Sequence, residues 1–146
     1  MVIKNNTNLV YITEQDIITN IQETMLQSSI EKNPDILDTL ESQVIDEVKS
    51  YIGARYDTSK IFGSPAIANG MLSRIIVCLV TYRAIRRNAA RKVPDDYVEM
   101  KDWAYEVLGN IRDGIMPLPD VPQTVDPETG EKLSLCGSNR KPEYFL

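Results

Sequence analysis

The sequence predicts an all-α protein, a compact bundle of about four helices followed by an extended C-terminal tail that includes a candidate β-hairpin. Apolar side chains recur at spacings of three and four residues through most of the first 115 positions. Helix-start signals precede these stretches, and five of the eight prolines lie between Pro117 and Pro142. We therefore expect an N-terminal arm (1–12), a helical domain (13–115) and a tail (116–146).

Composition limits the classes of protein to which this chain can belong. A chain of 146 residues is about the size of one domain with a single core. A net charge of -5 argues against nonspecific nucleic-acid binding. No stretch reaches the roughly 20 apolar residues that span a bilayer, and Met1 to Leu9 lacks a signal-peptide pattern. We expect no membrane contact and synthesis in the cytoplasm.

The first two helices are predicted from their caps and apolar stripes. Thr13 is a good N-cap with Asp16 three residues later, and the following stripe extends to the serine pair at 28 and 29. Asn33 and Pro34 then form a cap followed by proline, which starts a second helix that reaches Ile52.

The second helix runs into the junction Gly53-Ala54-Arg55-Tyr56. Here the glycine permits a turn or close packing, and Arg55 offers a cation near the negative end of a helix. We expect Tyr51 and Tyr56 to pack around Arg55. We interpret Gly53, Arg55 and Tyr56 as a structural junction, for which a simple helix terminus is the alternative.

A long central helix is predicted over residues 66–90, after a cap-then-proline signal at Ser64-Pro65. It is apolar around most of its circumference, so we expect it to be buried between other helices, with Cys78 as an inert thiol. Its far end carries five cations without an intervening acid: Arg83, Arg86, Arg87, Arg91 and Lys92.

The fourth helix begins near Pro94 and is expected to stop at Gly114. Asp95, Asp96 and Glu99 could in principle act as paired carboxylates or hold a metal. Their position at a helix N-terminus favours capping and interaction with the helix dipole instead.

The tail is predicted to be extended, because each proline fixes its own φ and disfavours helix before it. Residues 124–135 resemble a β-hairpin with Gly130 at the left-handed position of the turn. Residues 123–135 could add a strand to a neighbouring chain. The apolar side chains predicted to make this contact are Val125, Leu133, Leu135, Tyr144, Phe145 and Leu146.

Nothing in the sequence indicates catalysis. There is no histidine, the two cysteines lie far apart, and no glycine-rich phosphate loop or nucleophile elbow is present. We predict no enzyme activity, no metal and no cofactor.

The basic run 83–92 leaves three interpretations open. Its cations could be solvated or paired within the chain, could contact an acidic face of a neighbouring subunit, or could bind phosphates of a nucleic acid. The last interpretation would make the chain a small helical nucleic-acid-binding protein.

Several segments resemble a known family. They are YITEQDI (11–17), VIDEVKSYIGARYD (44–57), the long apolar helix with its arginine-rich end, and DDYVEMKDWAYEVLGNIRDGIMPLP (95–119). In this order they resemble the Mu-like phage domain related to head-tail connector proteins of tailed phages, over about residues 9–122.

That resemblance implies a structural virion protein at the head-tail interface. Such an adaptor binds the portal ring after DNA packaging, forms a ring with copies of itself and prepares the vertex for the tail or a second connector. The resemblance also implies an extended C-terminal segment that reaches the portal or neighbouring copies. DNA contact is not predicted to be specific.

Overall fold

The computed structural model describes residues 9–21, 25–26, 29–30, 33–87, 92–125 and 127–130. Within this part of the chain the fold is all-α, as the sequence predicts. The helices are α1 (Glu14–Ile18), α3 (Pro34–Ile52), α4 (Thr58–Ile61), α5 (Gly70–Arg86) and α6 (Asp95–Arg112).

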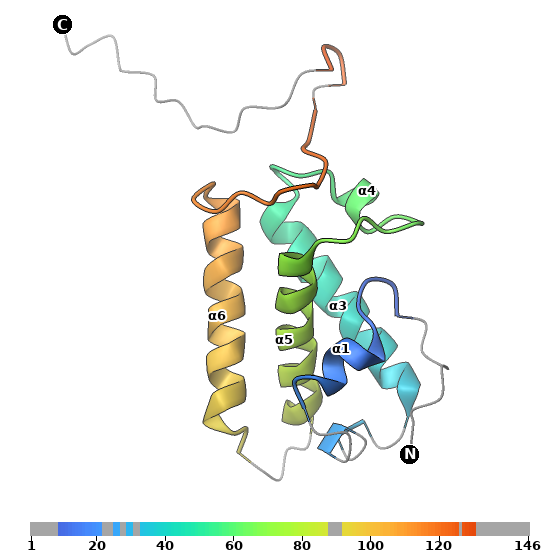
Figure 1. Ribbon diagram of the computed structural model, residues 1–146, viewed down its shortest axis with the longest axis vertical. Helices are drawn as coiled ribbons and strands as arrows, with labels where there is room; N and C mark the ends of the chain where they lie inside the picture. Colours follow the sequence, from blue (N-terminus) through green and yellow to red (C-terminus); the bar gives the residue numbers. More distant parts are fainter. Residues whose placement is uncertain are drawn as a thin grey trace, which may run out of the picture.

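Helix α5 lies at the centre of the bundle. It packs against α3 and α6, which also contact each other, and α1 lies across it (Figure 1). Every residue from Ile75 to Thr81 is buried, as expected for a helix covered on several sides. The α6 stripe that faces this core consists of Ala104, Val107, Leu108 and Ile111.

Helix α1 is shorter than predicted. The capping box between Thr13 and Asp16 is present, but the helix ends at Ile18. The hydroxyl of Thr19 donates to the carbonyl of Gln15, and the side-chain amide of Asn20 donates to the backbone carbonyl of Asp16. Such side-chain bonds compete with continued helix. Ile21 and Leu26 are nevertheless buried, so the predicted apolar stripe does enter the core.

Helix α3 has the predicted bounds. Asn33 caps it by accepting a hydrogen bond from the Asp35 amide at 3.1 Å, and Pro34 occupies the first turn. Its buried face includes Leu37, Val44 and Val48. The regular three-and-four spacing and the two unambiguous end signals explain this agreement.

The predicted start of the central helix is wrong. Helix α5 begins at Gly70 rather than after Ser64-Pro65, and Asn69 Oδ1 accepts from the amides of Met71 and Leu72, each at 3.1 Å. The segment between the junction and Ser64 also contains a short helix, α4, capped by Asp57. A stronger cap four residues beyond Pro65 thus replaces the cap-then-proline signal.

Helix α6 ends at the predicted glycine. Gly114 has φ +78°, its amide donates to the Ile111 carbonyl, and the Ile115 amide donates to the Asn110 carbonyl. This pair of bonds is the Schellman arrangement of a helix C-terminus. Asp95 and Asp96 lie in the first turn, and the N-cap, Pro94, provides no side-chain hydrogen bond.

The first part of the tail crosses the end of the bundle where α3 and α6 terminate (Figure 1). It is not extended throughout as predicted, because residues 119–120 form a turn in which Asp120 has φ +62°. Residues 127–129 form a turn, and Gly130 has φ +70°, the predicted left-handed conformation. The second strand of the predicted hairpin, 131–135, lies outside the described residues.

Candidate functional site

The predicted junction is the point at which three parts of the chain meet. Residues 53–57 connect α3 to α4, the tail runs alongside them, and the C-terminus of α6 lies against Arg55. Each of these contacts uses a different group of the junction.

The tail binds the junction through backbone hydrogen bonds. The amide of Asp57 donates to the Pro122 carbonyl at 2.9 Å, and the amide of Thr124 donates to the Arg55 carbonyl at 3.0 Å. Between them, Tyr56 and Gln123 form an antiparallel bridge. Strand pairing therefore begins within the chain at Gln123, and the pairing of residues 123–135 with a neighbour stays a prediction.

Tyr56 fixes the preceding part of the tail. Its side chain is buried, and its hydroxyl accepts a hydrogen bond from the amide of Leu118 at 2.8 Å. Leu118 is itself buried in the core cluster. The side-chain amide of Asn69 donates to the Pro119 carbonyl at 2.9 Å, which ties the cap of α5 to the same segment.

Arg55 caps a helix, but not the helix that the sequence suggests. Its Nε donates to the carbonyl of Arg112 at 2.8 Å, so the cation lies at the negative end of α6 rather than α3. Tyr51, predicted to pack around Arg55, has its ring 5.6 Å from the Arg112 guanidinium.

Two glycines make this packing possible. A Cβ on Gly53 would lie 2.6 Å from the carbonyl oxygen of Lys49, and a Cβ on Gly114 would lie 2.8 Å from the guanidinium carbon of Arg55. Both distances are shorter than a van der Waals contact. The absence of a side chain at Gly53 and Gly114 therefore lets the junction approach the ends of α3 and α6 closely.

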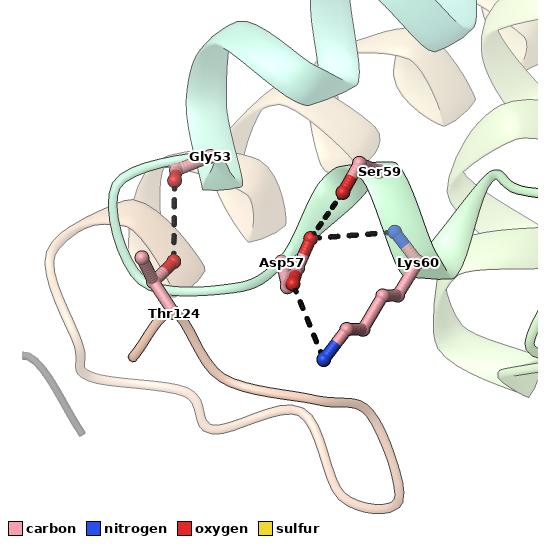
Figure 2. Close-up of polar contacts among 5 residues, drawn as sticks. All are labelled: Gly53, Asp57, Ser59, Lys60 and Thr124. Carbon is pink, nitrogen blue, oxygen red and sulfur yellow. Dashed lines mark hydrogen bonds and ion pairs between the residues drawn. The ribbon is translucent and has the colours of Figure 1, made fainter. Parts of the chain in front are cut away.

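Asp57 caps α4 beside the docked tail. Figure 2 shows its carboxylate facing the Ser59 hydroxyl at 2.6 Å and the backbone amide of Lys60 at 3.3 Å, with the Lys60 ammonium at 3.7 Å. The hydrogen bond from Ser59 is the main reason that the pKa of Asp57 lies below its usual value of 3.8. Across the junction, the hydroxyl of Thr124 points to the Gly53 carbonyl at 3.5 Å.

At the opposite end of α5, the basic run is only partly paired. Arg83 forms an ion pair with Glu47 of α3, so the intramolecular interpretation holds for this residue. Burial, followed by the hydrogen bond with Glu47, raises the pKa of the neighbouring Tyr105. Lys92 is exposed and lies 3.8 Å from Asp95.

Arg86 and Arg87 are exposed and form no ion pair with any described residue. Together with Arg83 they border an open hollow of about 580 Å³ between α3, α5 and α6. Lys101 of α6 also borders it, a contribution that the predicted basic run does not include. Arg91 lies outside the described residues.

The predicted apolar contacts of the tail are mostly undescribed. Val125 is exposed, as a contact residue requires. Leu133, Leu135, Tyr144, Phe145 and Leu146 lie outside the described residues. A further apolar side chain, Ile115, is 73% exposed. It directly precedes the part of the tail, residues 116–124, that docks on the junction.

One buried carboxylate is not among the residues predicted from the sequence. Glu41 of α3 is 1% exposed and accepts hydrogen bonds from the amides of Val10, Tyr11 and Ile12 at 2.6, 3.1 and 2.9 Å. These bonds hold residues 10–12 of the N-terminal arm against the bundle. A glutamate on the buried face of an amphipathic helix is the signal that could have revealed this contact.

The described residues offer neither a metal centre nor a membrane span. No group of three or more histidine, cysteine, aspartate or glutamate side chains is arranged to hold a metal ion among them. No helix in this part of the chain has the length and apolar character needed to cross a membrane. Cys78 is buried, and burial raises the pKa of its thiol.

Comparison of the chain with known protein families and with curated proteins finds no match.

Proposed function

We propose that this chain is a structural virion protein, a head-tail connector of a tailed phage. It binds the portal ring after DNA packaging, forms a ring with neighbouring copies, and prepares the vertex for the tail or a second connector. It is made in the cytoplasm of the bacterial host.

The anchored tail is the observation that carries this proposal. Hydrogen bonds that Leu118, Pro122 and Thr124 make with the junction fix the tail there. The chain beyond residue 125 therefore starts from a defined point at one end of the bundle. An adaptor needs such a point, because a segment that reaches a partner loses less entropy on binding when its base is already fixed.

The exposed side chains of the same segment support a contact surface there. Ile115 and Val125 are large, apolar and exposed, and they flank the docked residues. They supply apolar area at one end of the molecule. A head-to-tail ring requires two different surfaces on each copy, and the opposite end of the bundle offers the exposed Arg86 and Arg87.

Mixing the purified full chain with the portal ring of the same phage tests the proposal. Co-migration of the two in size-exclusion chromatography is expected, with density for this chain on the ring in cryo-electron microscopy. A variant ending at Gly130 keeps the docked segment and is expected to lose portal binding while its unfolding midpoint stays unchanged.

A self-sufficient dimer that ignores the portal would contradict the proposal. Salt-dependent binding to duplex DNA, abolished by Arg86→Glu with Arg87→Glu, would instead favour the small nucleic-acid-binding protein. The connector predicts that this double variant leaves DNA affinity unchanged.

A further inference from the structure

The basic hollow at the end of α5 has the dimensions of a small-ligand site. Its volume of about 580 Å³ lies within the roughly 300–1,000 Å³ typical of sites for small molecules. Leu40 and Leu79 lie behind the lining and are themselves buried. Tyr82 of α5 and Tyr105 of α6 add aromatic surface.

The cations around the hollow come from two helices, and two of them are held in place. Arg83 is paired with Glu47, and the ammonium of Lys101 lies 3.3 Å from the Asp102 carboxylate and 4.9 Å from the centre of the Tyr82 ring. Arg86 and Arg87 are the remaining cations of the lining. Among the described residues, no acidic side chain lines the hollow itself.

We infer that this hollow binds a nucleoside phosphate, with the phosphates on Arg86, Arg87 and Lys101 and the nucleoside against the half-buried rings of Tyr82 and Tyr105. Arginine provides several N–H donors that match phosphate oxygens, and lysine adds a point charge. An aromatic lining favours a ligand with a ring over bare phosphate. Such binding does not depend on the connector proposal.

The same features argue against duplex DNA as the occupant. Proteins that bind duplexes tightly make about 6–10 phosphate contacts along an extended surface. Here the cations of the lining surround one concave site, two of them are already ion-paired, and the whole chain has a net charge of -5. A short ligand with two or three phosphates matches this charge better.

Isothermal titration of the full chain with ATP in metal-free buffer tests the inference. We expect saturable binding of one ATP per chain, with AMP and inorganic phosphate each at least about tenfold weaker. Replacing Arg86 and Arg87 with glutamate is expected to weaken ATP binding at least about tenfold, and Lys101→Gln to weaken it by a smaller factor.

Lys92→Glu is the matched control. Lys92 belongs to the same basic run but does not line the hollow, so its charge reversal should change ATP affinity by less than about twofold. The arginines are exposed at the helix end, and circular dichroism of each variant verifies its folding.

Three results would overturn the inference. The first is the absence of ATP binding. The second is equal affinity for ATP and inorganic phosphate, which would show that the ring is not recognised. The third is tighter binding of a 20-base-pair duplex than of ATP, with Lys92→Glu as damaging as the arginine changes; this would indicate a nucleic-acid surface.

Discussion

At the scale of single residues, Gly114 is where the end of α6 and the junction constrain each other. Its φ is +78°, and the Arg55 guanidinium occupies the space of a Cβ. Gly114→Ala should therefore lower the free energy of unfolding by about 2–4 kcal/mol, since it combines left-handed strain with displacement of the Arg55 bond to Arg112. Urea denaturation measures the change.

Two other glycines serve as controls for this prediction. Gly130 has φ +70°, but no atom of the other described residues lies within 4 Å of the place that a Cβ would occupy, so Gly130→Ala should cost at most about 1–2 kcal/mol. Gly109 lies inside α6 with room for a methyl group, so Gly109→Ala should stabilise the protein by about 0.5–1 kcal/mol. Equal losses at Gly114 and Gly130 would exclude the proposed role of Arg55.

Asp57 gives the junction a dependence on pH. Its pKa is lowered in the folded protein, so its charged form contributes stability above the usual aspartate pKa of 3.8, and that contribution is lost as the pH falls through the folded value. The urea midpoint of wild type should exceed that of Asp57→Ala at pH 7. The difference should shrink below pH 3.8; a difference that stays constant under strongly acidic conditions would contradict this assignment.

At the scale of elements, the N-terminal arm depends on one buried carboxylate. Glu41→Ala removes the acceptor for three backbone amides, so we expect a loss of roughly 2–4 kcal/mol in the free energy of unfolding. Amide exchange of residues 10–12 should accelerate at the same time. Asp46→Ala, an exposed change on the same helix, is the control and should alter stability by less than about 0.5 kcal/mol.

The elements differ in how well the sequence predicts them. Both ends of α3 and the stop of α6 at Gly114 follow from local signals, a cap, a proline and a glycine. The predicted start of α5 and end of α1 are wrong, because Asn69, Thr19 and Asn20 make hydrogen bonds that local periodicity does not encode.

The candidate sites are predictable to a similar degree. The residues alone indicate a junction at Gly53, Arg55 and Tyr56. Which helix Arg55 caps depends on its contact with Arg112, 57 positions away in the chain. The docking of the tail depends on the contact of Tyr56 with Leu118, 62 positions away. Lys101 is not predicted at the basic hollow for the same reason, since only packing of α6 on α5 brings it beside Arg83.

At the scale of the whole molecule, the fold separates two surfaces along the axis of the bundle. The tail is anchored where α3 and α6 end (Figure 1). The basic hollow is lined by the C-terminal part of α5, including Arg83, Arg86 and Arg87. Docking the first part of the tail buries Leu118 and leaves exposed, besides Ile115 and Val125, Pro117, Pro119, Asp120 and Gln123. The connector proposal requires that this docking exist in the isolated chain.

Amide hydrogen exchange of the isolated full chain, read by NMR at Leu118 and Thr124, tests this requirement most directly. Both amides should exchange at least about a hundredfold more slowly than in an unfolded peptide, and Tyr56→Phe should remove the protection of Leu118. Exchange of both amides at the unfolded rate would show that the tail is not anchored, and would contradict the account.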